Sequence, residues 1–561
     1  MPTYKAPLDD IRFVLEDLLD VGQLSGLPGY ADATPELLAA ILEEAAKLCE
    51  DVLAPLNQPG DSQGCRYENG VVRTPTGFRD GYTAYVQGGW PAMVASPDFG
   101  GQGLPHIAGT VLDEMLCSSN LSFSMYPLLA HGTVGALQRW GDEELKRRFL
   151  PKLVDGTWTG TMCLTEPHAG TDLGMIRTRA VPAAPAGTKG ISLFLVPKRL
   201  PTDEGEAGSP NGVTCGSIEH KMGIKGNATC VINFDGATGW LVGDEHKGMR
   251  AMFTMMNGAR LGVGLQGLGL AEVAYQNALA YTKDRVQGRS LTGKKAPDQE
   301  ADPIIVHPDV RRMLLTQKAY IEGERALAYW VGQLIDIEEK HPDAEKRKEA
   351  EDLVALMTPI IKGFLTDTGF ECANLALQCL GGHGYIREYG LEQFVRDARI
   401  AQIYEGTNGV QALDLIGRKV PEGNGRLLRR FLALVQADLQ AAQGDARVAD
   451  LAKQLGEAVR KTQESIMTVI QKAMQNPDEA GAASTDFLRM MGLVATGWMW
   501  LKMARVALDR MPAANGDARF YDAKVKTARF YFAKLLPQVD ALTATMQSGA
   551  APVMELEAAA F

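Results

Sequence analysis

Several features of secreted, metal-binding and membrane proteins are missing from this sequence of 561 residues. Its eight cysteines are scattered from Cys49 to Cys379 without a C-x-x-C pair, which predicts reduced thiols rather than disulfides or a zinc site. No apolar run approaches the roughly 18 residues expected of a membrane span. The start, MPTYKAPLDDIRFVLEDLLD, lacks a basic segment followed by an apolar core. We therefore expect a cytoplasmic protein.

The sequence also has fewer basic than acidic residues. Lys and Arg total 57 against 68 Asp and Glu, which gives a net charge of −11 and a pI of about 5.4. That balance disfavours nonspecific binding to nucleic acid or anionic membranes, so we expect neither as a partner. The HExxH, GxSxG and Walker patterns are absent as well, and we expect no bound metal.

The chain does contain alternating helical and β-rich stretches. Thr34 and Pro35 suit the N-cap and first position of a helix that we expect to reach Leu53. Short β-branched or aromatic runs, separated by Gly, Pro, Asp and Asn, predict strands in Gly190–Lys198, Gly212–Ile218 and Ala228–Gly243. Helical patterns occupy both sides of this β-rich region.

A chain of this length is too long for one core, so several units are expected. The polar, glycine-bearing GRKVPEGNGR reads as a boundary before a last helical block. The predicted segments are an N-terminal extension (1–35), a helical N-terminal domain (36–158), a β-domain (159–245), a helical bundle (246–424) and an additional C-terminal helical domain (425–561).

One glutamate stands at the end of an apolar run. In ARIAQIYEGTNGVQALDLIGRK, Glu405 follows Ile400, Ile403 and Tyr404 and precedes Gly406. A solvated glutamate beside a short strand or at a helix start is one interpretation. The other is a carboxylate whose pKa is raised by desolvation, positioned to take a proton.

Three further motifs each allow two interpretations. GVGLQG (262–267) matches G-x-G-x-x-G but lacks a preceding buried strand, so we favour close helix packing over a dinucleotide fold. GGHGY (381–385) suits either a plain helix cap or an anion-binding loop. GTMCLTEPHAGTDLG (160–174) is either a surface turn, which we favour for the motif alone, or a loop that faces a flat, electron-accepting ligand.

Taken together and in order, these segments resemble the acyl-CoA dehydrogenase family. MCLTEPHAGTDLG, KMGIKG, NGARLGVG, LQCLGGHGY and VRDARIAQIYEGTN are similar to that family's motifs, over about residues 35–425. The N-terminal segment and the last helical block resemble a larger bacterial subgroup. The resemblance implies a mainly α fold with a central β-barrel domain, a catalytic helical bundle and the additional C-terminal helical domain.

The resemblance also implies a function. A member of this family uses FAD to oxidise an acyl-CoA to the trans-2-enoyl-CoA, with Glu405 removing the α-proton and flavin N5 accepting the β-hydride. The subgroup suggests a fatty acyl-CoA or 3-methylmercaptopropionyl-CoA as substrate, an electron-transfer flavoprotein as acceptor, and a homodimer. The alternative is a degenerate paralogue that keeps the scaffold as an assembly or regulatory partner.

Other residues carry over by position within the matched motifs. The resemblance implies cofactor contacts at Met162, Leu164, Thr165, Thr171, Arg285, Gln287, Gln378, Gly381, Gly382, Thr407 and Asn408. It implies substrate contacts at Thr171, Asn257, Arg260, Tyr404 and Gly406. Arg285, Gln287 and Gly381 are expected to complete the flavin site of a neighbouring subunit, which is why we expect a homodimer.

The sequence departs from the family after Ala180. Relatives continue through further strands, whereas here VPAAPAGTKG leads straight into ISLFLVPK. About thirty residues that would form neighbouring strands of one barrel are missing. We expect either a real deletion, with fewer strands than a closed barrel needs, or an interruption of the chain near Ala180.

Overall fold

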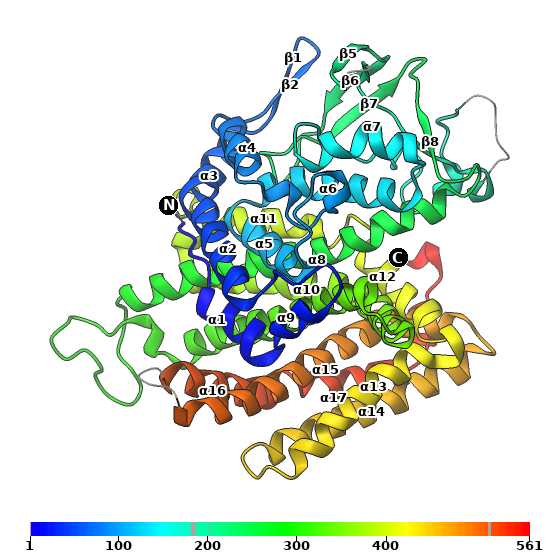
Figure 1. Cartoon of the computed structure of the whole chain (residues 1–561). Coiled ribbons are helices and arrows are strands. Elements are labelled where there is room, and N and C mark those ends of the chain that lie inside the picture. The colour runs from blue at the N-terminus through cyan, green and yellow to red at the C-terminus, as the bar shows by residue number, and fades with distance from the viewer. Residues whose placement is uncertain (1, 181–186, 203–204, 514–517) are drawn as a thin grey trace. The chain divides into compact units, whose positions relative to one another are not determined.

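The computed structural model describes residues 2–180, 187–202, 205–513 and 518–561, apart from the side chains of Asn257 and Ala513. The chain forms two compact units (Figure 1). The first comprises residues 1–44, 105–118 and 263–561, and the second comprises 45–104 and 119–262. The interruption predicted near Ala180 falls on residues 181–186, outside the described residues.

The helical part of the second unit is built from four helices and the end of a fifth. These are α3 (Ala54–Gln63), α4 (Phe78–Gln87), α6 (Leu121–Trp140) and α7 (Glu143–Val154), together with the end of α2 (Pro35–Lys47). Asn120 and Asp142 accept backbone N–H groups at the starts of α6 and α7. Leu137, Phe149 and Leu150 are buried where these two helices pack against the β-rich part of the unit. The Thr34 cap predicted for α2 is confirmed, because its Oγ1 accepts the N–H of Leu37 at 3.3 Å.

The three predicted stretches contain β3, β6, β7 and β8, whereas β1, β2, β4 and β5 were not predicted. Each strand pairs with a single neighbour in the described part of the chain. The antiparallel pairs are β1 (Arg66–Glu68) with β2 (Val71–Arg73), β3 (Leu193–Leu195) with β8 (Trp240–Val242), β4 (Arg199–Pro201) with β5 (Ala207–Pro210), and β6 (Val213–Ile218) with β7 (Cys230–Phe234). The described strands therefore form two-stranded sheets rather than a closed barrel.

Long helices, α8, α9 and α10, and shorter ones make up the bundle of the first unit. They are α1 (Leu8–Arg12), α5 (His106–Ser119), α8 (Gly248–Asp284, which begins in the second unit), α9 (Pro308–Lys340), α10 (Ala344–Cys379), α11 (Leu391–Ala401) and α12 (Asn408–Asp414). A Cβ on Gly264 would lie 2.5 Å from Ile361, and one on Gly267 would lie 2.2 Å from the carbonyl oxygen of Leu365. The glycines of GVGLQG thus bring α8 against α10, which confirms the helix-packing interpretation.

The C-terminal helices complete this unit. They are α13 (Glu422–Gln443), α14 (Ala449–Ala473), α15 (Asp478–Arg510), α16 (Ala518–Lys534), α17 (Gln538–Gln547) and α18 (Ala551–Met554). Helix α15 is largely buried and packs against α14, α16 and α17 (Figure 1). At the segment GRKVPEGNGR, Gly423, Asn424 and Gly425 all have positive φ and interrupt the helical path at the start of α13.

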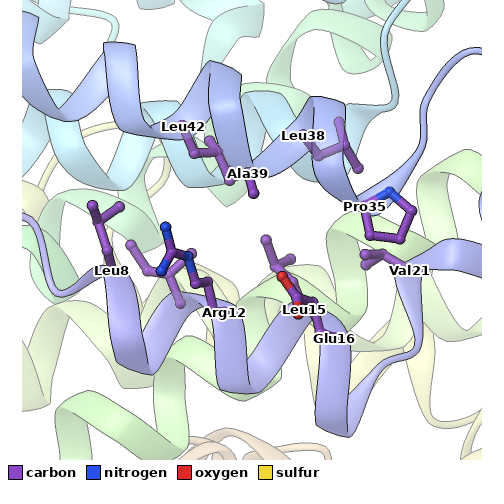
Figure 2. A pocket seen from close by; sticks show the side chains of 10 residues that line it. Leu8, Arg12, Leu15, Glu16, Val21, Pro35, Leu38, Ala39 and Leu42 are labelled. Carbon is purple, nitrogen blue, oxygen red and sulfur yellow. The ribbon is translucent and has the colours of Figure 1, made fainter.

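The N-terminal extension is tied to the first unit by polar contacts. The backbone N–H groups of Thr3 and Lys5 donate to the side chains of Asn277 and Gln276 on α8, both at 3.0 Å. Figure 2 shows a small, largely apolar crevice between this extension and α2, lined by residues that include Leu8, Leu15, Val21, Leu38 and Leu42.

One helix, α10, is long and apolar enough to cross a membrane by length and composition alone. In this structure 78% of its most apolar stretch is buried inside the fold. Such burial is typical of a core helix.

Candidate active site

Glu405 lies on a tight turn that joins α11 to α12. Its φ is +55°, in the left-handed region that residues other than glycine and asparagine seldom adopt. Gly406 follows with a φ of +84°. A left-handed conformation costs a non-glycine residue roughly 1–2 kcal/mol, so it persists only when neighbouring contacts impose it. The short strand considered for this segment is not formed; Glu405 follows a helix and is half-buried.

Hydrogen bonds close the turn at its neck. The N–H of Asn408 donates to the carbonyl oxygen of Gln402 at 3.1 Å, and Thr407 Oγ1 donates to the same oxygen at 3.2 Å. Gln411, one turn into α12, donates to the carbonyl oxygen of Gly406 at 3.2 Å. Gly406 and Thr407, predicted to contact substrate and cofactor, thus belong to the same closed turn as Glu405.

The side chains at the neck reach α10. Lys362 Nζ donates to Asn408 Oδ1 at 2.7 Å, and Asn408 Nδ2 donates to Asp367 at 2.7 Å and to Thr366 at 2.9 Å. Gln402 Nε2 donates to the same oxygen of Asp367 at 2.7 Å. Sequence reasoning missed Lys362, Asp367 and Gln402. The available signal was a lysine and an aspartate within the most apolar stretch of α10, which the structure places beside the turn.

Tyr404, on the other side of Glu405, is anchored to α8. Its hydroxyl donates to Gln266 Oε1. Burial raises the pKa of the Tyr404 phenol far above its usual value, and the charge of Glu405 acts in the same direction. Tyr404 therefore stays a neutral donor, and the turn is anchored to two helices that pack closely together.

In the second unit, the predicted flavin loop is shaped by Glu166. Its carboxylate accepts the backbone N–H groups of Arg177 at 2.8 Å and Thr178 at 2.9 Å, and the Thr178 hydroxyl at 2.7 Å. These donors lower the pKa of Glu166, led by the N–H of Arg177. Of the predicted contacts, Met162 and Leu164 are half-buried, and the hydroxyl residues Thr165 and Thr171 are exposed.

A third group lies at the end of α10 and the end of α8. Gln378, Gly381 and Gly382 are exposed, and Gly381 has a φ of +57°. Tyr281, near the end of α8, hydrogen-bonds His383 Nδ1 at 2.8 Å, which brings this segment beside the start of the loop that carries Arg285 and Gln287.

That loop is fixed by Asp302. The Asp302 carboxylate accepts the N–H groups of Ser290 at 2.8 Å and Ala296 at 2.7 Å, and these contacts lower its pKa to about 2. Arg285 and Gln287 are exposed, and Arg285 Nη2 donates to Gln287 Oε1 at 3.5 Å.

Of the predicted substrate contacts on α8, Arg260 is buried in the second unit. The Asn257 side chain lies outside the described residues. The predicted residues therefore form separate groups: the Glu405 turn and the Arg285–Gly382 group in the first unit, and the loop containing Thr165 in the second.

Three stretches of the chain match domains of one enzyme family. Residues 35–157 match the acyl-CoA dehydrogenase N-terminal domain, 246–420 the acyl-CoA dehydrogenase C-terminal domain, and 431–557 a domain described as acetyl-CoA dehydrogenase C-terminal like. The chain belongs to the acyl-CoA dehydrogenase family. The predicted family, the enzyme class and the additional C-terminal helical domain are thereby confirmed. The predicted β-domain, 159–245, lies entirely between the first two matched stretches.

Relatives match this acyl-CoA dehydrogenase along its whole length. A 3-methylmercaptopropionyl-CoA dehydrogenase of Ruegeria pomeroyi is 40% identical, covering 96% of this chain and 97% of that protein. A broad-specificity linear acyl-CoA dehydrogenase of Mycobacterium tuberculosis is 32% identical, with both chains covered completely. Among solved structures, Caenorhabditis elegans ACDH-11 in complex with C11-CoA has a TM-score of 0.76 over 94% of this chain and 91% of that chain, at 19% identity, which shows a shared fold.

The family's cofactor is FAD, and the predicted residues suit that group. A Cβ added to Gly170, Gly381 or Gly382 would meet nothing within 4 Å, so these backbones are open to a large ligand. Exposed hydroxyls at Thr165 and Thr171 offer donors to ring or phosphate oxygens. In the described part of the chain, no cluster of three His, Cys, Asp or Glu side chains could hold a metal.

Proposed function

We propose that this protein catalyses the α,β-dehydrogenation of an acyl-CoA thioester to the trans-2-enoyl-CoA. FAD, when bound, would accept the β-hydride at N5, chemistry that no side chain can supply. The observation that carries the proposal is the turn at Glu405. Its left-handed backbone is strained for a glutamate, and it is anchored on both sides, an arrangement that tends to occur where function requires one conformation.

Glu405 is proposed to take the α-proton of the bound thioester. An α-proton beside a thioester is a weak acid, so a base that is partly shielded from water is favoured. Tyr404 and Asn408 hold the two ends of the turn and keep the carboxylate in one place. Arg260 and Thr171 are proposed to contact the CoA part of the substrate. These roles rest on their positions in the motifs that resemble the family.

The substrate is proposed to be a fatty acyl-CoA or 3-methylmercaptopropionyl-CoA. The support is identity along the full chain to relatives that carry those specificities in their names. Reoxidation requires an external acceptor, and we propose an electron-transfer flavoprotein in the bacterial cytoplasm. Fatty-acid β-oxidation is the metabolic setting that fits a fatty acyl substrate.

Assembly into a homodimer is proposed from the group at the end of α10. Tyr385 is 84% exposed, and Ile386 and Tyr389 beside it are exposed as well. Apolar side chains gathered next to the exposed Arg285 and Gln287 suit an interface between two copies, through which these residues would reach a neighbour's FAD.

A second candidate function has one observation in its favour. The described β-strands form only two-stranded sheets, so a non-catalytic paralogue that serves as an assembly or regulatory partner is the alternative. The two candidates differ in whether the chain binds FAD and reduces it with an acyl-CoA.

One experiment separates them. The purified protein is examined for a flavin absorbance spectrum and titrated without oxygen against acyl-CoAs of increasing chain length and 3-methylmercaptopropionyl-CoA. We expect stoichiometric FAD and bleaching of its absorbance by at least one of these thioesters. Protein that is folded but fails to bind added FAD, or that binds FAD without bleaching by any thioester, would favour the paralogue.

A further inference from the structure

The Glu405 turn meets α10 through a compact polar group, of which the family resemblance identified Asn408 alone. We define the clasp as Lys362 and Asp367 on α10 together with Gln402 and Asn408 at the two ends of the turn. Gln402 and Asn408 lie three residues before and three residues after Glu405. All four residues belong to the first unit.

A single carboxylate oxygen joins the two ends of the turn. Asp367 Oδ1 accepts from Gln402 Nε2 and from Asn408 Nδ2, both at 2.7 Å. The same two residues are joined through the backbone, where the N–H of Asn408 donates to the Gln402 carbonyl at 3.1 Å. The neck is therefore tied twice, once through its backbone and once through Asp367.

Lys362 orients the amide of Asn408. Its side chain is fully buried, and its Nζ donates to Asn408 Oδ1 at 2.7 Å. The amide nitrogen of Asn408 then faces Asp367 and Thr366, which supply acceptors. Burying a lysine is costly unless polar partners compensate, so its presence at this position calls for an explanation beyond packing.

We propose that Lys362, Asp367 and Gln402 are positioning residues, which act through Asn408 and the turn neck to hold Glu405 in its left-handed conformation. This inference rests on the proposed role of Glu405 as the base. A reacting group displaced by about 1 Å can lose on the order of 100-fold in rate, so a loosened turn should slow proton removal more than it weakens substrate binding.

Gln402→Leu and Lys362→Met test the clasp in the FAD-loaded protein. Each variant has a matched control in the first unit. Gln333→Leu removes a similar half-buried amide, whose Nε2 donates to the Leu19 carbonyl at 2.9 Å, and Lys524→Met removes another buried lysine. Measured quantities are FAD content, kcat, KM for one acyl-CoA, and the isotope effect on kcat with α-deuterated substrate.

For both clasp variants we expect kcat to fall about 10- to 100-fold, with KM within about threefold and unchanged FAD content. The α-deuterium isotope effect should increase, because proton removal becomes the slow step. The control variants should keep kcat within about twofold below their unfolding temperatures, whatever they do to stability. Gln402→Leu alone decides the test if Lys362→Met fails to fold.

Glu405→Gln is measured in parallel. If it is inactive while Gln402→Leu keeps wild-type kcat and isotope effect, the positioning inference is overturned and the base assignment stands. If Glu405→Gln keeps wild-type kcat, the base assignment fails, and the inference fails with it.

Discussion

Glu166 and Glu405 both occupy short irregular segments, one in each unit, and their carboxylates are used in opposite ways. The Glu166 carboxylate is occupied by backbone and hydroxyl donors that fold the loop around it. At Glu405 the contacts come from the residues on either side of it. Gln402 and Asn408 both donate to Asp367 on α10, and the Tyr404 hydroxyl donates to Gln266 on α8. Donors that stabilise the charge of a glutamate make it a weaker base, which is why we assign Glu166 a structural role and keep Glu405 as the proposed base.

The two units also differ in how deeply their charged side chains are buried. In the first unit, Arg325 is 1% exposed and pairs with Glu114 at 2.5 Å, Glu272 at 2.6 Å and Asp10. Lys524 of α16 also contacts Asp10, so this buried network joins the N-terminal extension, the bundle and the C-terminal helices. The Glu166 loop in the second unit lies nearer the surface, since Thr165 and Thr171 are exposed.

The largest expected effect on stability follows from this network. Arg325→Met should lower the free energy of unfolding by about 3–5 kcal/mol, because three buried carboxylates lose a shared partner. Arg460→Met is the matched control: Arg460 pairs with Glu457 and Glu464 at 2.6 Å but is 51% exposed, so less than about 1 kcal/mol is expected. Urea denaturation measures both, and equal losses would contradict the difference in burial.

A smaller effect is expected at Glu166. Glu166→Gln keeps the shape but replaces an ionised acceptor of three donors, which should loosen the loop and weaken FAD binding by roughly 10-fold, in line with 1–3 kcal/mol for hydrogen bonds to a charged group. At saturating FAD, kcat should stay within about threefold, since we assign this carboxylate no proton-transfer role. Fluorescence titration with FAD and steady-state kinetics check the two parts, and a collapse of kcat at full FAD occupancy would refute the assigned difference between the two glutamates.

The Glu166 loop also makes a prediction about pH. Its depressed pKa means that the contribution of Glu166 to loop order is present above the unfolded pKa and is lost as pH falls through the folded pKa. FAD affinity in the wild-type protein should therefore be kept between neutral pH and about pH 5 and weaken below the ordinary glutamate pKa, and it should depend less on pH in Glu166→Gln. Parallel titrations at pH 7 and about pH 3.5 would show this, and identical pH dependence in both proteins would count against it.

A separate effect on stability concerns Glu324, a buried carboxyl on α9. Burial raises its pKa well above the usual value. Its stabilising contribution is present below the unfolded pKa and is lost as pH rises towards the folded pKa, at up to about 1.4 kcal/mol per pH unit. Glu324→Gln should remove this part of the decline in unfolding free energy between pH 5 and pH 8. An unchanged decline would show that Glu324 ionises without cost.

Local signals in the sequence predicted several of these features correctly. The Thr34 cap, the strands around Cys230 and the packing glycines of GVGLQG are confirmed, because each depends on neighbouring residues or on one helix face. The clasp was missed because Lys362 and Gln402 are far apart in the sequence, and periodicity does not reveal which turn a polar residue on a core helix will meet. The closed barrel was expected from the resemblance, and the short strands of this region form only pairs in the described residues.

The assignment of Glu405 as the base is tested most directly by a single-turnover measurement. FAD-loaded wild-type protein and Glu405→Gln are mixed without oxygen with the same saturating acyl-CoA, and the loss of flavin absorbance is followed in time. We predict that both bind the thioester with Kd values within about threefold, and that bleaching in Glu405→Gln is slower by about 100- to 10,000-fold. Bleaching of Glu405→Gln at a rate within about tenfold of wild type would contradict the assignment.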